Sequence, residues 1–557
     1  MHQLFVLGAD KESRPFGKRY KYDRAKAITF PWKGMPLQKS GEEMKQLQKA
    51  LNVSNTLKEA AKTFCDREAA VVGERRMTYG ELDQEVTKLA NQLIQLGVKS
   101  GDHVGIALQN SLEFIIAFYA IARAGAVIIP INPFFSKEES AYVVEQSQAK
   151  LIFCGEKAYF QELRYEIETL EKLISVGFEE DEFISYSRLM MRGSPKEPLH
   201  VEPKEDLFAI LFTSGTTGRS KGAMLTHENV LYSTLSAAKV MKCTEEDIFL
   251  MPNPLFHIFG VTFILRAASC GGKLIVMEKY SVTKALELIE KEKVTVHPGV
   301  PTMFTLELNH PDFSKYNVSS LRTGEMAAAP CPVEVVKRIR KEMNCNVLVA
   351  YGMTETSATL TITGFEDSDE LRSETVGRPI PGVRIKIVDE NREECETGRV
   401  GEIACKGPVV TKGYFNMPEE TAKAIDHEGW FYTGDIATID ESGYVRIVGR
   451  KKEMIIRGGF NIYPRELEES LHQHPDIVHA AVIGLPDEIY GEITCACVVL
   501  KKGSKASEES LAEYMKQRFV KYKIPDTIMI LNELPVTPSG KISKLKLKEK
   551  IEQQRGF

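Results

Sequence analysis

The chain has 557 residues, of which 43% are hydrophobic and 27% are charged. That length is too great for one compact core, so two or more domains are expected, and the composition excludes a disordered or fibrous protein. The formal net charge of −5 gives no general attraction to nucleic acid, and the ten cysteines contain no Cys-X-X-Cys pair, which indicates a reducing, cytoplasmic setting with free thiols.

The first forty or so residues differ from the rest of the chain. Lysine and arginine far outnumber acidic residues there, and hydrophobic periodicity is weak. We interpret residues 1–45 as a basic N-terminal extension that is loosely ordered, or that reflects a start codon placed too early, rather than as a membrane or nucleic-acid tether. The longest apolar stretch, residues 114–131, contains Arg123, Gly125 and Pro130, so it predicts a helix that runs into a strand. Any membrane contact is expected to be peripheral at most, and no nucleic-acid partner is expected.

From about residue 50 onward, helical and strand patterns alternate. Apolar residues three or four positions apart predict helices over residues 283–292 and 333–342. Short β-branched runs between them predict strands at residues 274–277, 294–296 and 347–349. This order predicts an α/β fold, with a large N-terminal domain of parallel and mixed sheets covered by helices, at residues 46–451.

Near Gly449 the pattern changes to a small α+β C-terminal domain, which we expect at residues 452–557. Its predicted strands lie at 480–483 and 496–500, and its predicted helix at about 508–521. Cys495 and Cys497 would point to the same face of one strand, where packing is expected rather than metal binding.

A ten-residue loop, TSGTTGRSKG at residues 213–222, is the most informative feature of the chain. It follows an apolar run at 207–212 that is typical of a buried strand. Glycines let backbone N–H groups approach a ligand, hydroxyl groups add hydrogen bonds and a lysine adds positive charge, so the loop predicts a polyphosphate site rather than an ordinary polar turn. It is not the P-loop of ATPases, because Lys221 follows Ser220 and precedes Gly222. The residues expected to bind nucleotide here are Thr213, Ser214, Gly215, Thr216, Thr217, Gly218 and Lys221.

A second loop, YGMTETS at residues 351–357, directly follows a predicted strand at 346–350. Ligands of open α/β sheets bind at the carboxyl ends of strands, so both loops are expected to face one crevice. Tyr351 offers a ring on which a purine can stack, Thr354 a hydroxyl for phosphate, and Glu355 an oxygen ligand for Mg²⁺. A helix cap formed by Thr354 is the alternative, and the presence of the first loop weakens it.

Three further motifs lie toward the C-terminus. YTGD ends at Asp435, whose carboxylate can accept both hydroxyls of a ribose, although Thr-Gly-Asp is common in turns. GRKKEMIIRGGFNIYPRELE, at residues 449–468, combines a basic cluster with a Gly-Gly turn. PSGKISK, at residues 538–544, presents Lys541, and an isolated lysine in such a turn is usually only solvated.

In this set of motifs the chain resembles the adenylate-forming superfamily, which contains acyl-CoA synthetases, 4-coumarate–CoA ligases, firefly luciferase and peptide-synthetase adenylation domains. The resemblance extends over roughly residues 50–550 and also includes MTYGEL (77–82), ARAGAVIIPINP (122–133), FHIFG (256–260), GEIACKGPVVTKGY (401–414) and KYKIP (521–525). It implies an enzyme that uses ATP and Mg²⁺ to convert a carboxylic acid to acyl-AMP and then transfers the acyl group to coenzyme A. A homodimer is compatible with the sequence.

The resemblance also implies roles for residues at matching positions. Asp435 and Arg450 would hold the ribose of ATP, and Lys541 would reach the α-phosphate and the acyl carboxylate. His257 resembles the gate between nucleotide and acyl pocket, although it could equally be a core histidine, and Lys452 matches the hinge. Glu355 and Thr216 would serve Mg²⁺. The remaining positions implied for the nucleotide are Ala327, Tyr351, Gly352, Met353 and Thr354, and those beside the pantetheine tunnel are Gly458, Gly459 and Phe460.

One segment departs from the family pattern, because TGEMAAAPCP at 323–332 stands where the family usually has Ser-Gly-Ala-Ala-Pro. Together with HPGVPTMF at 297–304, it suggests an aliphatic acyl slot without a fixed counter-charge, lined by Val261, Met303, Met326 and Met353. This favours a fatty monocarboxylate of medium to long chain. An aryl-CoA ligase of the 4-coumarate type, and a stand-alone adenylation enzyme that loads a carrier protein, stay open as alternatives. An amino-acid activator is disfavoured, because His257 stands where such enzymes place an Asp for the ammonium group.

Overall fold

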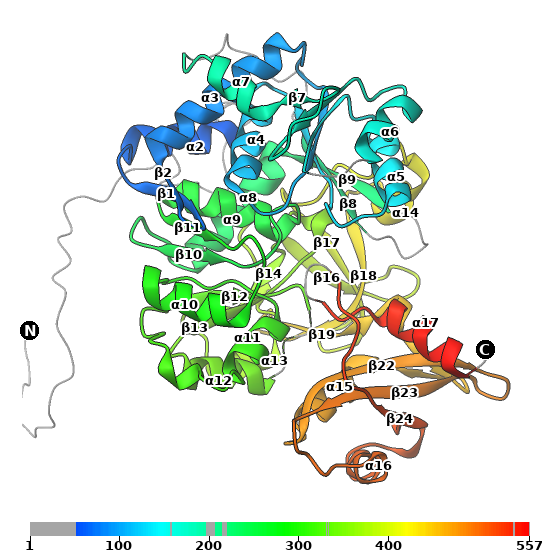
Figure 1. Cartoon of the computed structure of the whole chain (residues 1–557). Coiled ribbons are helices and arrows are strands. Elements are labelled where there is room, and N and C mark those ends of the chain that lie inside the picture. The colour runs from blue at the N-terminus through cyan, green and yellow to red at the C-terminus, as the bar shows by residue number, and fades with distance from the viewer. Residues whose placement is uncertain are drawn as a thin grey trace, which may run out of the picture.

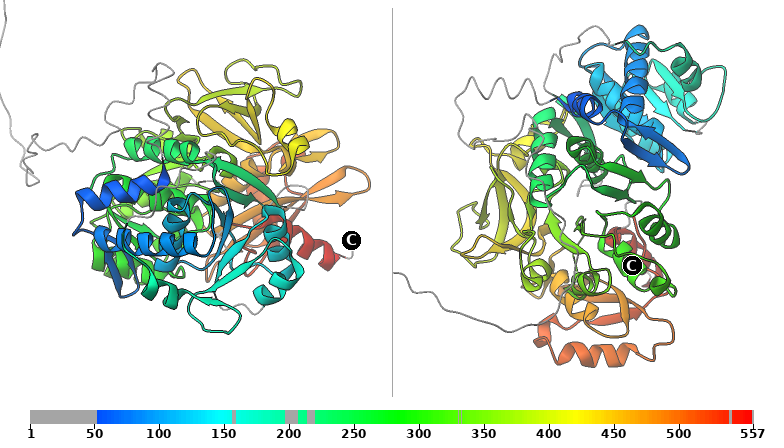
Figure 2. Two further views of the ribbon diagram at one scale, coloured as in Figure 1. Left: turned by 90° about the horizontal axis from the view of Figure 1, so that it is seen from above. Right: turned by 90° about the vertical axis from the view of Figure 1, so that its left-hand side faces the viewer.

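The computed structural model describes residues 52–155, 159–196, 207–213, 220–329, 331, 333–537 and 541–555. The predicted N-terminal extension, residues 1–45, lies outside the described residues. A large body runs from α2 to β19, and a smaller C-terminal unit, coloured orange to red, lies at its lower end (Figures 1 and 2).

A seven-stranded sheet in the order β7-β6-β5-β3-β4-β8-β9 forms one layer of the large domain. Its strands pair in parallel except for β8 and β9, which are antiparallel. The predicted helix-to-strand passage at 114–131 is confirmed as α4 followed by β4, and the predicted strand at 207–212 is β8. The strands are β3 (His103–Ala107), β4 (Val127–Pro130), β5 (Leu151–Cys154), β6 (Lys172–Ser175), β7 (Ile184–Ser185), β8 (Leu207–Thr213) and β9 (Lys221–Thr226). Helices on this side are α3 (Tyr79–Gln95), α4 (Leu112–Arg123), α5 (Lys137–Ser147), α6 (Tyr159–Glu166) and α7 (Tyr186–Arg192).

A second layer consists of the strand sets β10-β11-β1-β2 and β12-β13-β14-β15. Isolated bridges from Val296 to Phe249 and to Thr323 join the two sets. The predicted strand at 294–296 is therefore wrong: Lys293 ends α10 with a positive φ and Pro298 follows shortly, so only Val296 pairs. The strands are β1 (Glu68–Val72), β2 (Arg75–Thr78), β10 (Ile248–Met251), β11 (Lys273–Val276), β12 (Thr323–Met326), β13 (Asn346–Tyr351), β14 (Thr361–Ile362) and β15 (Arg378–Pro379).

Helices cover this second layer, and the pair α8 and α9 connects the two layers, because α8 packs on β9 whereas α9 packs on β10 and β11. The predicted helices at 283–292 and 333–342 are confirmed as α10 and α12. The helices are α2 (Val53–Thr63), α8 (His227–Val240), α9 (Ile258–Cys270), α10 (Val282–Glu292), α11 (Pro301–Leu308), α12 (Val333–Glu342) and α13 (Asp369–Glu374), with short 3₁₀ turns η1 (Phe313–Lys315) and η2 (Thr354–Thr356).

An antiparallel sheet, β16-β17-β18-β19, completes the large domain and leads into the small one. In it, β18 and β19 pair so that Asp435 lies opposite Arg450. Its elements are β16 (Arg384–Val388), β17 (Gly401–Lys406), α14 (Pro418–Ala424), β18 (Phe431–Ile439), β19 (Val445–Arg450) and the 3₁₀ turn η3 (Lys451–Glu453).

The small C-terminal domain has its own core around the five-stranded sheet β21-β20-β23-β22 with β24 beside β23. Leu467 of α15 and Leu511 of α16 pack in one hydrophobic cluster, whereas Leu547 of α17 packs in another. Cys495 and Cys497 are buried in that second cluster, 4.0 Å apart at sulfur, as expected for packing residues. The elements are β20 (Ile455–Arg457), β21 (Phe460–Ile462), α15 (Pro464–His472), β22 (Ile477–Asp487), β23 (Gly491–Leu500), α16 (Glu508–Lys516), η4 (Lys521–Lys523), β24 (Thr527–Ile530) and α17 (Lys544–Arg555).

The helix predicted at 508–521 is too long, since α16 ends at Lys516. Gln517 closes the helix, Phe519 turns back to hydrogen-bond Met515 and packs against the small-domain core, and Val520 is already extended. The predicted fold class, a large α/β domain followed by a small α+β domain, is confirmed. The boundary between residues 451 and 452 stays a prediction.

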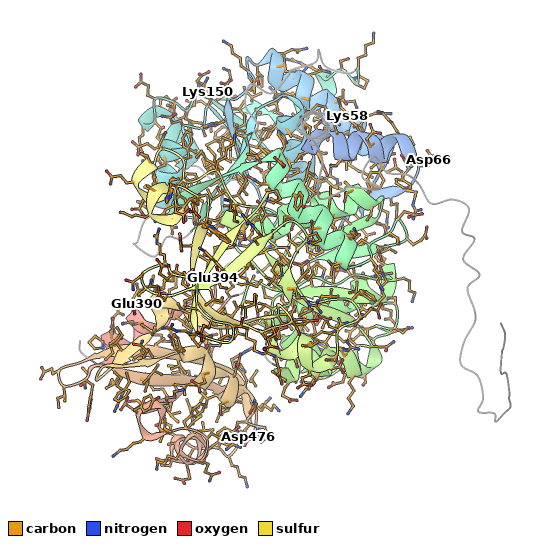
Figure 3. The ribbon with its side chains drawn as sticks, turned by 180° about the vertical axis from the view of Figure 1, so that it is seen from behind. Lys58, Asp66, Lys150, Glu390, Glu394 and Asp476 are labelled. Atoms are coloured by element: carbon orange, nitrogen blue, oxygen red, sulfur yellow. The ribbon has the colours of Figure 1, made fainter. Side chains whose placement is uncertain are left out.

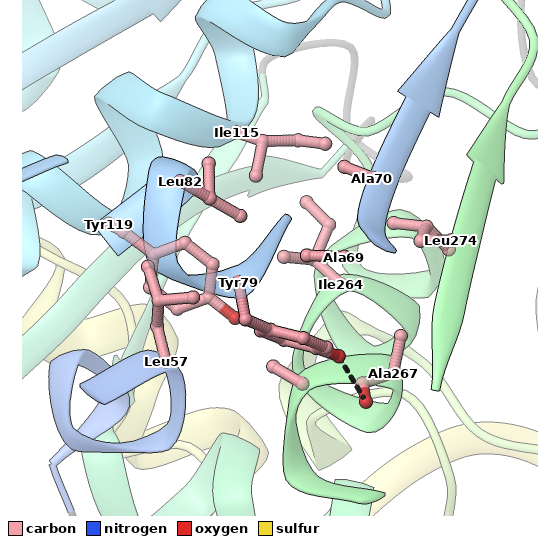
Figure 4. A pocket seen from close by; sticks show the side chains of 11 residues that line it. Leu57, Ala69, Ala70, Tyr79, Leu82, Ile115, Tyr119, Ile264, Ala267 and Leu274 are labelled. Atoms are coloured by element: carbon pink, nitrogen blue, oxygen red, sulfur yellow. Dashed lines mark hydrogen bonds between the residues drawn. The ribbon is translucent and has the colours of Figure 1, made fainter. Parts of the chain in front are cut away.

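The MTYGEL segment has a packing role in the structure. The Tyr79 hydroxyl donates hydrogen bonds to the carbonyl oxygens of Ala267 (3.0 Å) and Gly272 (2.6 Å) inside the large-domain core. Figure 4 shows this ring beside a void of about 10 Å³ lined by Leu57, Ile115 and other apolar side chains. That volume is at the lower limit for one water molecule, so the void is a packing defect rather than a ligand site.

The surface carries both signs of charge, as the labelled side chains Lys58, Asp66 and Lys150 in Figure 3 illustrate. Among the described residues, no helix combines the length and the apolar character that a bilayer crossing requires.

Candidate active site

The ends of two strands bring the two predicted phosphate loops together. Thr213 ends the buried strand β8, and Glu355 lies in η2, directly after β13. The Thr213 hydroxyl donates to Glu355 Oε1 at 3.3 Å, and the Tyr414 hydroxyl donates to the same oxygen at 3.1 Å. The backbone N–H of Thr411 holds the carbonyl of Glu355 at 2.8 Å. Ser214, Gly215, Thr216, Thr217 and Gly218 lie outside the described residues.

A second cluster forms around Asp435, whose side chain is buried. The Tyr351 hydroxyl donates to Asp435 Oδ2 at 2.7 Å, and Arg450 Nε lies 3.2 Å from Asp435 Oδ1. Burial raises the pKa of Asp435, whereas the charge of Arg450 opposes that increase. The charge of Glu355 also acts on Arg450 and helps to raise its pKa, which indicates that the two clusters lie close together.

Backbone geometry explains the glycine of the second loop. A Cβ at Gly352 would lie 1.8 Å from the carbonyl oxygen of Ala358, so no side chain can be accommodated there. The neighbouring Thr354 is buried in η2, and Met353 packs on the large-domain core. The loop is therefore held tightly at the end of β13.

Lys541 reaches this site from the small domain. Its backbone is fixed by two hydrogen bonds with Thr537: the Thr537 N–H donates to the Lys541 carbonyl at 2.7 Å, and the Lys541 N–H donates to Thr537 Oγ1 at 3.2 Å. Burial and the charge of Arg450 lower the pKa of Lys541 to about 8, and Asp435 acts in the opposite direction. The charges of Arg450 and Asp435 therefore act on Lys541, although Lys541 comes from a different domain.

His257 occupies the N-cap of α9, where its Nδ1 accepts a hydrogen bond from the Phe259 N–H at 3.2 Å. Burial, with a contribution from the positive charge of Lys541, lowers the pKa of His257 to about 3. The imidazole is therefore neutral at physiological pH. Its position near Lys541 is compatible with the predicted gate as well as with a structural cap.

Lys221 is engaged by two residues that the sequence analysis did not assign. Its ammonium group pairs with Glu420 of α14 and lies 5.1 Å from the centre of the Tyr414 ring. Tyr414 ends the GEIACKGPVVTKGY motif, so the motif itself could have indicated it. Glu420 gave no signal, because an acidic residue in the first turn of a helix is common for reasons of helix stability.

The remaining predicted positions lie farther along the chain. Lys452 lies in η3 between the two domains, where burial and Arg450 lower its pKa. Gly458 and Gly459 form the turn between β20 and β21. Phe460 begins β21, and its ring stacks on Tyr522 at 4.6 Å. The described contacts of this turn are within the small domain, so the structure does not bring it to Asp435. Ala327 is buried directly after β12.

The predicted acyl slot is apolar but has charged neighbours. Val261, Met303 and Met326 are buried, which fits core packing as well as an acyl slot, so the slot stays a prediction. Next to Met326, Glu325 of β12 forms a buried ion pair of 2.6 Å with Arg266 of α9. Consecutive residues of a strand point to opposite faces, so this compensated pair does not place a counter-charge beside Met326, and a slot without a fixed counter-charge stays a prediction.

Glu355 is the described residue best suited to hold a magnesium ion. Within the described residues, its Oε1 accepts the two hydrogen bonds given above, and its Oε2 accepts none. A single carboxylate with phosphate oxygens is a usual Mg²⁺ environment, and the part of the chain that the structure describes contains no group of three His, Cys, Asp or Glu suited to an all-protein metal site.

Comparison with known proteins identifies the family. Residues 57–415 match the family model of the AMP-binding enzymes, and residues 466–541 match that of the AMP-binding enzyme C-terminal domain. The chain therefore belongs to the AMP-binding enzymes, and its relatives place it among the adenylate-forming ligases of the acyl-CoA synthetase type.

Two curated relatives and one solved structure illustrate this. The Bacillus subtilis protein YngI, whose name assigns it provisionally to the acyl-CoA synthetases, is 37% identical over 89% of this chain and 96% of its own. The human mitochondrial medium-chain acyl-CoA ligase ACSF2 is 34% identical over 90% of this chain and 88% of its own. The ATP-bound crystal structure of MatB from Rhodopseudomonas palustris is 30% identical, with a TM-score of 0.82 over 90% of this chain and 99% of that chain.

Proposed function

We propose that the protein activates a fatty carboxylic acid of medium to long chain with ATP, and then transfers the acyl group to coenzyme A. The observation that carries this proposal is the convergence of Lys541, from the small domain, with Asp435 and Arg450 of the large domain. The similarity to relatives named as acyl-CoA synthetases and as a medium-chain acyl-CoA ligase supports the substrate class.

In the first half-reaction, a carboxylate oxygen attacks the α-phosphorus of ATP, the bond to the β-phosphate breaks, and pyrophosphate leaves. Asp435 accepts the ribose hydroxyls, with Arg450 beside it, and the Tyr351 ring stacks on the adenine. Lys541 and Lys221 neutralise negative charge, so that one anion can approach another. Such preorganised charges in a partly dehydrated site are effective, because no solvent has to reorganise during the reaction.

In this proposal Glu355 would hold Mg²⁺, together with Thr216 of the predicted phosphate loop. When bound, the ion would supply additional positive charge to the phosphate oxygens. Glu355 is suited to this because Thr213 and Tyr414 fix one of its oxygens and leave the other available among the described residues.

In the second half-reaction, the thiol sulfur of coenzyme A attacks the acyl carbon and its proton passes to solvent. The bond between the acyl carbon and the phosphate oxygen breaks, and AMP leaves with that oxygen. We propose that the small domain turns about Lys452, which removes Lys541 and brings the turn of Gly458, Gly459 and Phe460 to the site. The domain limits at 46–451 and 452–557 belong to this proposal. His257 would gate the path between nucleotide and acyl group.

A pyrophosphate-release screen tests the proposal. Purified protein is given ATP, coenzyme A and a panel of straight-chain, branched, aromatic and amino acids. We expect octanoate and palmitate to support pyrophosphate release and thioester formation. A preference for cinnamates would favour an aryl-CoA ligase, and formation of acyl-AMP without thioester would favour a carrier-loading enzyme.

A cytoplasmic location, peripheral membrane contact at most and a homodimer stay predictions. The human relative is named as mitochondrial.

A further inference from the structure

Lys544, the first residue of α17, is held between two carboxylates, one from η3 and one from α15. Its Nζ lies 2.7 Å from Glu468 Oε1 and 3.0 Å from Glu453 Oε2. The exposed fraction of the side chain is 24% for Lys544, 9% for Glu468 and 30% for Glu453, so the two ion pairs are largely shielded from solvent. Burial opposes the charge of Lys544, but the two carboxylates outweigh burial and keep its pKa above the ordinary value.

The two carboxylates fix Lys544 to different parts of the molecule. Glu468 of α15 is itself held by the sheet, because its Oε1 accepts the Val482 N–H of β22 at 2.7 Å. Glu453 lies in η3, where its Oε1 is 4.0 Å from Arg450 Nη1. Arg450 in turn contacts Asp435 of the candidate nucleotide site. A continuous series of charges therefore runs from the site to the start of α17.

The same residues lie next to the segment that carries Lys541, which is also anchored by the packing of Leu534 and Ile542. Two backbone hydrogen bonds pair the described residues on either side of Lys541: the Thr537 N–H donates to the Lys541 carbonyl and the Ser543 N–H donates to the Pro535 carbonyl, both at 2.7 Å. We call residues 535–537 and 541–543 together the Lys541 turn. Lys544 follows Ser543 directly, so its two ion pairs tie the turn to η3 and α15.

We propose that Lys544 is a positioning residue for acyl-adenylate formation: it fixes the Lys541 turn within the small domain through Glu453 and Glu468, so that Lys541 enters the nucleotide site in the productive position. This inference rests on the proposed function. A misplacement of a reacting group by about 1 Å can cost roughly 10²-fold in rate, so a firm attachment of the turn has a direct kinetic value. Since all three residues follow the proposed hinge at Lys452, the tie moves with the small domain, and its loss affects the step that uses Lys541.

The experiment measures the two half-reactions separately in Lys544→Met, Lys544→Arg and a control, Lys548→Met. Lys548 lies on the same helix, and its Nζ is 4.0 Å from Glu552 Oε1, a longer separation than in either ion pair of Lys544. We expect Lys544→Met to lower acid-dependent pyrophosphate release by roughly 10- to 100-fold, while thioester formation from synthetic acyl-AMP and coenzyme A changes by less than about threefold. Lys544→Arg should recover most of the loss, because a guanidinium can pair with both carboxylates. Lys548→Met should match the wild type in both steps.

Equal losses in both half-reactions, or an unchanged rate of pyrophosphate release in Lys544→Met, would overturn the inference. Thermal unfolding checks that the variants are folded. If Lys544→Met does not fold, Glu453→Gln provides the same comparison and must show the same selective loss in the first step. A wild-type protein that forms no acyl-AMP with any acid contradicts the proposed function itself, whereas an active wild type with unselective variants contradicts only the role of Lys544.

Discussion

The lowered pKa of Lys541 predicts an unusual pH dependence for the first half-reaction. Burial and the nearby charge of Arg450 lower this pKa to about 8. Only the protonated ammonium group can neutralise phosphate charge, so the contribution of Lys541 is complete below its pKa and is lost as the pH rises through it. An ordinary lysine, with a pKa of about 10.4, would lose it only at much higher pH.

The size of the effect follows from the fraction of protonated lysine. At pH 9 a group with a pKa of about 8 is about one-tenth protonated, so kcat/KM for ATP should fall to about a tenth of its value at pH 7. Lys541→Ala should lose roughly 10²–10³-fold at pH 7, as expected for removal of an electrostatic contact to the transition state. Lys541→Arg stays protonated throughout and should show no decline between pH 7 and 9.

The assay is the single-turnover rate of acid-dependent pyrophosphate release at ATP concentrations well below KM, whose dependence on ATP gives kcat/KM for this step. Coenzyme A is left out, so that no thiol titrates. The pKa of His257, at about 3, is too low for this residue to titrate in the range measured. A wild-type profile that stays flat to pH 9.5 would refute the reasoning. The same decline in Lys541→Ala, or near-normal pyrophosphate release by that variant, would remove Lys541 from the mechanism.

Three further outcomes are expected. Lys452→Pro should slow thioester formation more than adenylation, because proline restricts the backbone at the proposed hinge, and equal effects measured on both half-reactions would argue against a hinge there. Glu420→Gln should lower the KM for ATP severalfold by releasing Lys221 from its ion pair, and an unchanged or higher KM would show that the pair does not compete with nucleotide. Glu325→Leu leaves the charge of Arg266 buried without its partner, so it should lower the free energy of unfolding, measured with denaturant, by about 3–5 kcal/mol. A loss below about 1 kcal/mol would contradict a stabilising role of the Glu325–Arg266 ion pair.

Local patterns were sufficient to predict much of the fold. The apolar run before Thr213 predicted β8, and the stripe of Val333, Val336 and Ile339 predicted α12, because each pattern reflects burial of one element face. Two predictions were wrong, namely the strand at 294–296 and the helix end at residue 521. Residues next to the predicted strand limit its pairing, and the core contacts of Phe519 determine where α16 ends.

The candidate site was predictable only in part. Loops that follow strands, such as the one at Tyr351, could be recognised from residue types and from their place in an α/β fold. The partners of these residues could not, because the pairs of Lys221 with Glu420 and of Lys544 with Glu453 join segments far apart in the chain. Such pairs depend on tertiary packing, which a single sequence does not specify pair by pair.

The central claim is that loops from both domains meet on one triphosphate to activate a carboxylic acid. The most direct test follows the fate of ATP with octanoate, first without and then with coenzyme A. The account predicts acid-dependent formation of AMP and pyrophosphate, with acyl-AMP held until coenzyme A converts it to the thioester. Release of ADP and phosphate, or no consumption of ATP with any organic acid, would contradict it.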